Sequence, residues 1–351
     1  MAPHITAMLM MFLGIGTSIT FASSNWILAW VGLEINTLAI LPLMTQRFHP
    51  RAIEAAVKYF LVQEAAAATI LYSAALNAWL TGEWAILETS HPAVTHMCTI
   101  GLALKIGLAP LHAWLPEVLQ GLELSTGLIV ATWQKLAPFI LLTQVGTYTP
   151  CLLTFLGLVS IMVGGWGGLN QTQLRKILAY SSVAHLGWMA LMLKFFPSLT
   201  LLTLIIYIIM TMSLFLLFSL NNTKTIGGLA ISWNKTMTLT TLIPFLLFSL
   251  AGLPPLTGFM PKWFILHELT KQNLPLLATV AALSALMSAY FYLRLAYAMT
   301  MTTPPGLTTN KTPWRRHNPV RSLPLALSAA VTILALPLAP ALMALMSPSS
   351  W

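Results

Sequence analysis

Long apolar runs dominate this chain, and they restrict what it can fold into. About eleven runs of roughly 17–25 residues follow one another, and a run of that length is typical of a helix that crosses a bilayer. The composition agrees, because 57% of the residues are hydrophobic and 7% are charged, whereas a soluble protein carries about 25% charged residues. The sequence therefore predicts an all-α polytopic membrane protein.

Short turn-forming segments separate the predicted spans, and no linker is long enough to divide the chain into soluble domains. We expect a single transmembrane domain over residues 1–351, with residues 302–322 as its longest polar loop. The spans are expected at roughly residues 3–22, 25–44, 55–80, 92–122, 125–143, 149–169, 176–193, 199–221, 238–271, 274–301 and 324–346.

Two of these runs are interrupted by proline, and the interruptions are copies of each other. Residues 107–117 and 252–262 lie 145 positions apart at both ends, with Gly, Leu and Pro at matching places. Paired, interrupted spans in two halves of a membrane protein indicate an ion or substrate site. A single proline kink would carry less weight, because kinks occur in many spanning helices without a transport role.

Each break is expected to leave a backbone carbonyl without its helical partner. Proline frees the carbonyl four residues back, which is that of Ile106 for Pro110 and that of Ala251 for Pro255. Freed groups persist at membrane depth only when they are buried in protein or line a wet cavity. The two breaks are therefore predicted to lie in one of these settings.

The distribution of cations predicts an orientation. The net charge is +9, and ten cations fall on the face that bears the N-terminus: Arg47, Arg51, Arg175, Lys176, Lys224, Lys235, Lys311, Arg315, Arg316 and Arg321. The other face receives two cations and two acids: Lys194, Lys271, Glu83 and Glu88. This is the positive-inside bias. It places the N-terminus on the side where the chain is made and Trp351 on the opposite side. Scattered cations of this kind do not indicate nucleic-acid binding.

Four ionisable residues fall within the predicted spans or beside the breaks: Glu34, Lys105, Lys135 and Lys262. A charge at the bilayer centre costs at least about 2.5 kcal/mol without compensation, so these residues are functional candidates. Burial disfavours the charged form of a lysine and a nearby carboxylate restores it, which suits proton transfer. A static interhelical salt bridge is the alternative, although it accounts for Glu34 and only one lysine.

Other polar residues have two interpretations each. His112, at the first break, either relays protons or hydrogen-bonds a freed carbonyl, and His185 is either a relay member or a satisfied polar group in the bundle. Glu117 and Glu123, which flank the first broken helix, either collect protons or are solvated.

The remaining polar candidates are equally open. Glu64 either pairs with Lys58 or lies on a packed face. His267 and Glu268 either line an exit or are solvated at the interface. The basic loop at residues 311–321 either docks partners or cardiolipin headgroups or supplies ordinary positive-inside charge.

No metal or nucleotide motif stands out. Cys98 and Cys151 lack the spacing of a zinc or iron–sulfur site and are interpreted as small packing residues. His91 and His96 have no third ligand. Residues 164–168 (GGWGG) lack a preceding strand, so close helix packing is the expected role of these glycines.

Four motifs point to a family. They are residues 30–36 (WVGLEIN), 132–138 (TWQKLAP), 170–182 (NQTQLRKILAYSS) and 252–259 (GLPPLTGF). With them the chain resembles, essentially end to end, the chain 2 family of mitochondrial NADH–ubiquinone oxidoreductase, respiratory complex I. The Thr- and Met-rich composition is similar to that of a mitochondrially encoded animal subunit.

The resemblance implies an antiporter-like fold of two inverted five-helix repeats, each with a broken helix. The repeats would cover about residues 3–143 and 149–301, followed by a C-terminal helix at about 324–346. The resemblance also implies that Glu34 and Lys105 form the family's Glu–Lys pair. Lys135 would be its central lysine, and Lys262 its lysine on the second broken helix.

The same resemblance implies a function. The chain would translocate protons across the inner mitochondrial membrane, driven by electron transfer from NADH to ubiquinone. NAD, FMN, iron–sulfur clusters and ubiquinone would bind to partner subunits, and this chain would hold no cofactor and no metal. Other membrane-arm and accessory subunits and lipids, cardiolipin among them, would be its partners. The N-terminus would face the matrix and the C-terminus the intermembrane space.

Two other functions are compatible with the residues. A stand-alone cation/proton antiporter would share the same fold. A structural membrane scaffold would hold the same buried charges statically, and it would keep working when Lys135 or Lys262 is replaced by Met.

Overall fold

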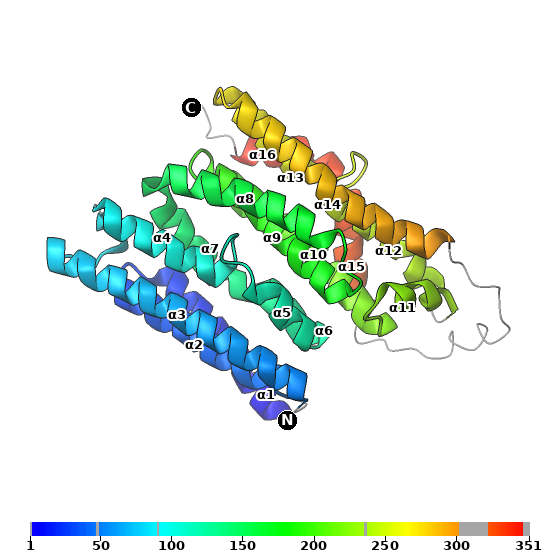
Figure 1. Cartoon of the computed structure of the whole chain (residues 1–351), viewed down its shortest axis with the longest axis horizontal. Helices are drawn as coiled ribbons and strands as arrows, with labels where there is room; N and C mark the ends of the chain where they lie inside the picture. Colours follow the sequence, from blue (N-terminus) through cyan, green and yellow to red (C-terminus); the bar gives the residue numbers. More distant parts are fainter. Residues whose placement is uncertain (1, 47–48, 90, 235–236, 302–321, 347–351) are drawn as a thin grey trace. The chain divides into compact units, whose positions relative to one another are not determined.

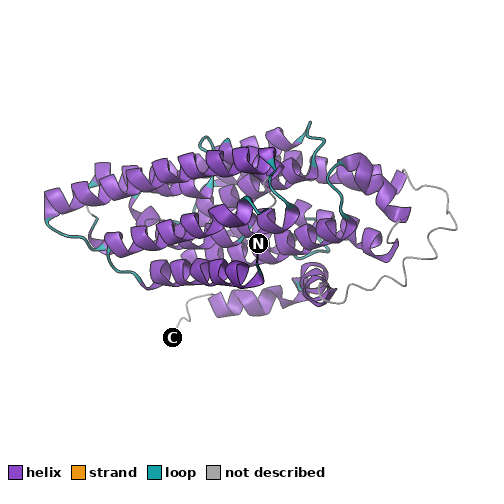
Figure 2. Ribbon diagram, turned by 90° about the horizontal axis from the view of Figure 1, so that it is seen from below, coloured by secondary structure: helices purple, strands orange, loops and turns teal. Residues whose placement is uncertain are grey.

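The computed structural model describes residues 2–46, 49–89, 91–234, 237–301 and 322–346. Helices make up almost all of this part, and Figure 2 draws no strand in it. Seven of the described helices are long and apolar enough to cross a membrane, or eight when one bent pair counts as a single span. The basic loop at residues 311–321, together with Arg47, Lys235 and Trp351, lies outside the described residues.

The chain forms two compact units, Met1–Val159 and Ser160–Trp351, with the division inside helix α8. The first unit contains a series of helices coloured blue to green in Figure 1. They are α1 (Pro3–Ala22), α2 (Trp26–Met44), α3 (Pro50–Thr81), η1 (Ile86–Glu88), α4 (Pro92–Ile106), α5 (Trp114–Gly121), α6 (Leu124–Ala131), α7 (Trp133–Val145), η2 (Gly146–Tyr148) and the start of α8 (Pro150–Gly168).

Within the first unit, α2 packs against α1 on one side and α3 on the other, and α3 also packs against α4 (Figure 1). Small residues set the closest of these approaches. A Cβ on Gly16 would lie 2.4 Å from the Asn36 side chain, and one on Gly32 would lie 2.6 Å from Thr20. Small residues at helix crossings are how spanning helices approach closely, and here they bring α1 and α2 together.

The second unit contains the remaining helices of the described residues. They are the rest of α8, α9 (Leu174–Met192), α10 (Pro197–Asn221), α11 (Ile226–Ile231), η3 (Ser232–Asn234), α12 (Met237–Ala251), α13 (Phe259–Lys271), α14 (Pro275–Met301), α15 (Ser322–Leu334), η7 (Leu336–Leu338) and α16 (Ala339–Met346). In this unit α10 packs against α12 and α15, and α12 also packs against α14.

Proline marks where many of the helices begin. Its missing N–H costs nothing at the first helical position, and its fixed φ suits that position. Six helices start in this way, at Pro3, Pro50, Pro92, Pro150, Pro197 and Pro275.

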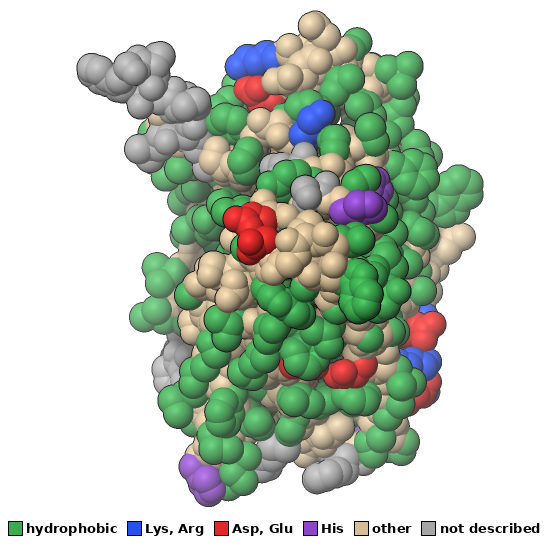
Figure 3. Space-filling model, turned by 90° about the vertical axis from the view of Figure 1, so that its left-hand side faces the viewer, with side chains coloured by type: hydrophobic (Ala, Val, Ile, Leu, Met, Phe, Trp, Pro, Cys, Tyr) green, Lys and Arg blue, Asp and Glu red, His purple; other side chains and the backbone are tan. Residues whose placement is uncertain are grey.

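Apolar side chains also cover most of the face seen in Figure 3, as expected for helices that meet lipid.

The glycines of residues 164–168 confirm the expected close helix packing. A Cβ on Gly164 would lie 2.6 Å from the backbone of Ala184 on α9, and one on Gly168 would lie 2.7 Å from the ring of Phe291 on α14.

One of the two cysteines differs from the expectation, because Cys98 is buried but Cys151 is exposed. Cys151 is therefore not a packed core residue of this chain.

Both predicted breaks occur, and two others were not expected. The run at 125–143 is interrupted at Thr132, whose hydroxyl donates to the Leu128 carbonyl at 2.7 Å, a back-bond that bends helices. The run at 324–346 bends by 61° between α15 and α16. Pro337 lies at this bend and frees the carbonyl of Ile333.

Within the described residues, each unit contains one isolated β-bridge in a corresponding place. Asn25 pairs with Ala85, and Gln173 pairs with Thr225. Each bridge joins the residue before a long helix, α2 or α9, to the segment that follows the next long helix. The two units thus repeat a local arrangement as well as a sequence motif.

Candidate functional site

A buried ion pair lies in the first unit. Lys105 Nζ is 3.6 Å from Glu34 Oε1, and the two side chains are 2% and 14% exposed, respectively. Lys105 lies in the last turn of α4, and Glu34 lies midway along α2. The structure therefore joins two residues about seventy positions apart in sequence, on neighbouring segments of one unit.

Other polar groups hold this pair in place. Thr37 donates its hydroxyl to Glu34 Oε2 at 3.2 Å. Gln63 on α3 donates its amide to the Lys105 main-chain carbonyl at 3.3 Å. The carboxylate and the end of α4 are thus fixed by hydrogen bonds from α2 and α3, which limits how freely the two charges separate.

The first break follows directly after Lys105. Gly107 ends α4 with φ +86°, and the N–H groups of Gly107 and Leu108 both donate to the Ala103 carbonyl, at 2.9 and 3.0 Å. The indole of Trp114 donates to the Leu104 carbonyl at 3.1 Å. The buried C-terminal end of α4 is therefore capped by a left-handed glycine and a tryptophan.

The second break repeats this cap 145 positions later. Gly252 has φ +81°, and the N–H groups of Gly252 and Leu253 both donate to the Phe248 carbonyl, at 3.1 and 3.2 Å. Here a lysine completes the cap, since Lys262 Nζ donates to the Ala251 carbonyl at 2.7 Å. Ala251 carries the carbonyl that Pro255 was expected to free.

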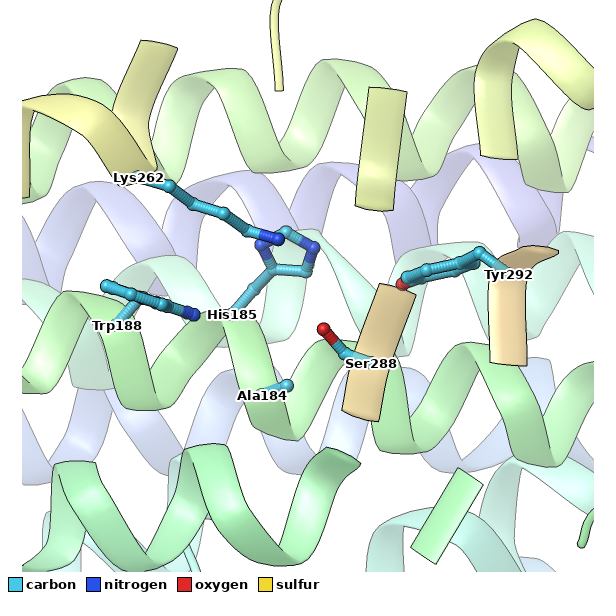
Figure 4. Close-up of a pocket in the computed structure, with 6 residues that line it drawn as sticks. All are labelled: Ala184, His185, Trp188, Lys262, Ser288 and Tyr292. Carbon is cyan, nitrogen blue, oxygen red and sulfur yellow. The ribbon is translucent and has the colours of Figure 1, made fainter. Parts of the chain in front are cut away.

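Lys262 also faces a small pocket within the second unit (Figure 4). The pocket is lined by α9, α13 and α14 through Ala184, His185, Trp188, Lys262, Ser288 and Tyr292. In Figure 4 the Lys262 amine and the His185 ring both point into it. The His185 ring centroid is 5.6 Å from that of Tyr207. The structure thus gathers titratable groups from three helices beside the second break.

Lys135 is buried, with 2% of its surface exposed, on the first turn of α7 directly after the break at Thr132. Its neighbour Gln134 donates to the Asn36 carbonyl on α2 at 3.1 Å.

His112 lies in the first break and hydrogen-bonds the backbone of Pro110. A hydrogen bond to a backbone carbonyl is compatible with both interpretations of His112.

The pairing of Glu64 with Lys58 is wrong. Lys58 Nζ instead lies 2.8 Å from Glu54 and 2.8 Å from Glu117, and all three side chains are well exposed. Glu117 is therefore a member of a surface ion-pair cluster. Glu54 and Glu117 both lie at contact distance from the Lys58 ammonium, so Coulomb attraction is satisfied by these two carboxylates.

A second group of ion pairs lies near the end of α13, where Lys271 and His267 are exposed and Glu268 is partly buried. Lys271 Nζ lies 3.0 Å from Glu268, and His267 lies 4.0 Å from the same carboxylate. Among the described residues, no group of three or more His, Cys, Asp or Glu side chains could hold a metal ion.

Sequence reasoning did not single out Arg294, although it is a cation inside the apolar run of α14. Its guanidinium donates to the Leu169 carbonyl beyond the end of α8. A cation at a helix C-terminus complements the negative end of the helix dipole. A search for every cation within a predicted span would have found it.

The fold and its buried charges define a class of membrane protein. Residues 23–288 match the family profile described as NADH:quinone oxidoreductase/Mrp antiporter, TM, and residues 289–343 match that of the NADH dehydrogenase subunit 2 C-terminus. A chain of respiratory complex I from Thermus thermophilus has a similar fold, with a TM-score of 0.83 and 30% identity over 96% of this chain and 80% of that one.

Curated relatives specify the family further. The chain is 60% identical to NADH-ubiquinone oxidoreductase chain 2 of Tetraodon nigroviridis, over 98% of this chain and 99% of the relative. It is also 60% identical to the same chain of Gadus morhua, over 99% of this chain and 100% of the relative. The chain belongs to the NADH-ubiquinone oxidoreductase chain 2 family.

Proposed function

We infer that this chain is a membrane-arm subunit of NADH:ubiquinone oxidoreductase, respiratory complex I, and that it acts as an antiporter-like, proton-translocating module. The observation that carries this inference is the buried Glu34–Lys105 pair beside a broken helix, in a chain of this family. Electron transfer takes place in partner subunits. NAD, FMN, iron–sulfur clusters and ubiquinone belong to those partners, and this chain contributes the membrane path for protons.

The proposed path uses Glu34, Lys105, Lys135 and Lys262, with His112 and His185 as further members. The attraction within one such ion pair is of the same order as the work of moving one proton across the membrane. At 3.6 Å and an effective dielectric of about 20, the attraction of one ion pair is about 4–5 kcal/mol. Moving one charge against about 150–200 mV takes roughly 3.5–4.6 kcal/mol. Opening and closing such a pair is therefore comparable with the work of moving one proton.

Lys262 has a distinct part in this path. Its amine is held by a main-chain carbonyl and not by a carboxylate. A carbonyl accepts a hydrogen bond from the ammonium and from the neutral amine alike, so Lys262 can release a proton without leaving a charged partner behind. His185, which lines the same pocket, is a suitable next group.

The helix boundaries support a finer description of the fold. Counting α4–α5, α6–α7, α12–α13 and α15–α16 each as one broken span gives about eleven spans. Five of them precede residue 149, and five more reach residue 301. An odd number of crossings reverses the second repeat, so the repeats at about 3–143 and 149–301 are inverted, and a C-terminal helix follows at about 324–346. The matching glycine caps and β-bridges support this repeat.

The surroundings follow from the same family and from the charge pattern. The subunit lies in the inner mitochondrial membrane among other membrane-arm and accessory subunits and lipids. The positive-inside bias puts the N-terminus in the matrix and the C-terminus in the intermembrane space. The cations at residues 311–321 suit anionic headgroups such as cardiolipin.

Native purification followed by reconstitution tests the function. The chain should migrate in a very large assembly with inhibitor-sensitive NADH:quinone activity, and vesicles holding that assembly should acidify on one side. Lys135→Met should lower the number of protons moved per NADH oxidised, because the buried amine is then lost. Lys194→Met, at an exposed position, is the matched control. A chain that runs alone, or a Lys135→Met complex that pumps normally, would overturn the proposal.

A further inference from the structure

Arg294 is a cation on an exposed face of the apolar helix α14. Every third or fourth residue along this face is exposed, which places these residues in one line on the helix. The line consists of Leu283, Met287, Tyr290, Arg294, Tyr297 and Met301. Because the other members are apolar or aromatic, the face is suited to lipid, and Arg294 is its one charged member.

The second half of α8 packs closely against α14 near this line. A Cβ on Gly165 would lie 3.0 Å from the Cβ of Met287, and one on Gly168 would lie 2.7 Å from the ring of Phe291. The guanidinium of Arg294 donates to the carbonyl of Leu169, directly after the last residue of α8. Arg294 therefore lies at the seam between the second half of α8 and α14, level with the end of α8.

The length of α8 indicates the depth of this guanidinium in the membrane. The helix has 19 residues, and at 1.5 Å per residue it spans about 28 Å, close to the hydrocarbon thickness of about 30 Å. Its end is thus expected at the edge of the hydrocarbon. Tyr290 and Tyr297, about one turn to either side of Arg294, are both exposed, and tyrosine is enriched at this level. The guanidinium therefore lies at the depth of lipid headgroups.

The second unit supplies no nearby counter-charge for Arg294. Residues 160–351 contain twelve lysines and arginines but one acidic side chain, Glu268. That carboxylate pairs with Lys271 at 3.0 Å, just before α14 begins, whereas Arg294 lies about 28 Å along α14 from Pro275. Within the described ranges, no carboxylate lies at ion-pair distance from Arg294. An anion from outside the unit is therefore needed to neutralise it.

Other cations gather at the same end of this unit. Arg175 and Lys176 lie in the first turn of α9, a few residues after Leu169. The Lys224 main-chain carbonyl accepts a hydrogen bond from the N–H of Leu174 at 3.2 Å, which brings a further lysine to the start of α9. Residues 160–225 contain no acid, so the potential around the end of α8 is positive and attracts anions.

We propose that the seam between the second half of α8 and α14 binds the headgroup of an anionic phospholipid, with Arg294 holding its phosphate. A guanidinium has five N–H donors in a planar fork that matches phosphate oxygens. One of them is used by the Leu169 carbonyl, and this hydrogen bond fixes the direction of the others. Tyr290 and Tyr297 flank the headgroup, and one acyl chain lies along the apolar residues toward Leu283.

The dimensions of the exposed line favour a lipid over a free phosphate ion or a carboxylate of another chain. Leu283 lies eleven residues before Arg294, which is about 16 Å along the helix and about half the hydrocarbon thickness. An acyl chain covers the same distance. A free phosphate ion would leave this apolar surface uncovered, and a carboxylate would pair with Arg294 without requiring tyrosines on both sides of it.

Lipid photolabelling of the assembled complex tests this site without turnover, so its result is independent of proton translocation. The complex would be placed in bilayer nanodiscs with photoreactive phosphatidylglycerol or photoreactive phosphatidylcholine, each with the reactive group on an acyl chain. Mass spectrometry would then measure the labelling of residues 283–297. The variants are Arg294→Gln and Arg294→Lys, with Lys194→Gln, an exposed cation beyond the far end of α9, as the matched control.

We expect phosphatidylglycerol to label these residues more than phosphatidylcholine does in the wild type. Arg294→Gln should lower that labelling about fivefold, since one cation near an anionic headgroup is lost. Arg294→Lys should retain part of it, because the charge remains but the planar fork does not. Lys194→Gln and an excess of inorganic phosphate should change nothing.

Several results would overturn the inference. They are equal labelling by the two lipids in the wild type, unchanged labelling in Arg294→Gln, and no lipid labelling of these residues, as expected if another subunit covers them. Loss of labelling on addition of inorganic phosphate would assign the site to the free ion instead. If Arg294→Gln does not assemble, Arg294→Lys decides, and a wild-type ratio of phosphatidylglycerol to phosphatidylcholine labelling in that variant would contradict the proposal.

Discussion

Lys262 Nζ donates to the main-chain carbonyl of Ala251 at 2.7 Å. This carbonyl belongs to the residue four positions before Pro255, where no helical N–H is available. A lysine side chain therefore supplies the donor that the broken helix lacks. The charge of Lys262 and the shape of the break are linked, because the amine that can gain or lose a proton also caps the helix end.

Replacement of Lys262 by Met should remove both the titratable charge and the cap of the broken helix. The nonpolar side chain leaves the Ala251 carbonyl without its donor, at a cost of about 1.5–3 kcal/mol for a hydrogen bond from a charged group. We expect fewer protons per NADH oxidised and a lower temperature of disassembly, measured by vesicle acidification and by thermal inactivation. Lys271→Met, at an exposed lysine on the same helix, should change neither, and equal behaviour of the two variants would contradict the assigned role.

The two glycine caps should respond differently to alanine. Both have positive φ, so either substitution costs about 1–2 kcal/mol in backbone strain. At Gly252 the new Cβ would also lie 2.9 Å from Lys262 Cδ and 3.0 Å from its Nζ, whereas at Gly107 the nearest atom is Leu115 Cδ1 at 3.1 Å. Gly252→Ala should therefore lower proton translocation more than Gly107→Ala. Equal translocation in the two variants, assayed at matched complex content, would argue against a coupled cap.

A double-mutant cycle should measure the coupling energy between Glu34 and Lys105. Glu34→Gln or Lys105→Met alone leaves a buried partner uncompensated, which typically costs about 3–5 kcal/mol. The double variant removes both charges, so its loss of thermal stability should be smaller than the sum of the single losses. Proton translocation should stay low in all three variants. Strictly additive losses of stability would mean that the 3.6 Å contact carries no coupling energy.

Gly258 should tolerate no side chain. It lies next to the second break, where a Cβ would fall 1.6 Å from the Ser249 carbonyl oxygen, far inside contact distance. We expect Gly258→Ala to lower the amount of assembled complex severely, as seen by native electrophoresis. Gly14→Ala, at a helical glycine with nothing within 4 Å of its Cβ position, should assemble normally. Normal assembly of Gly258→Ala would show that the break relaxes more easily than this geometry suggests.

Much of the fold could be predicted from the pattern of apolar residues. The helix ends agree with the expected spans to within a few residues for most segments, as for α1 at Pro3–Ala22 and α10 at Pro197–Asn221. The breaks near Pro110 and Pro255 are confirmed, and in each the helix ends at a left-handed glycine, Gly107 or Gly252, before the proline. Proline alone does not decide a break, since α2, α7 and α12 continue through Pro42, Pro138 and Pro244. The short helix α11 at Ile226–Ile231 was missed, since six residues are too few for a periodic signal.

The candidate residues could be identified from the sequence, and the resemblance implied the Glu34–Lys105 pair that the structure shows, but the pairing of the surface charges could not be predicted. A charged side chain within the membrane has a high free-energy cost, so Glu34, Lys105, Lys135 and Lys262 stand out in the sequence. Which carboxylate meets which cation depends on helix rotation and crossing, which the apolar pattern does not define. Glu117 with Lys58 is such a pairing.

The sequence by itself determined that this chain forms a bundle of spanning helices with two proline-broken copies of one motif, because bilayer thickness and proline chemistry act on local segments. Only the tertiary structure decided that Lys262 caps the carbonyl of Ala251 and that Lys58 pairs with Glu54 and Glu117 and not with Glu64. Contacts of this kind depend on how distant segments pack, and distances of a few ångströms between buried charges determine their energies.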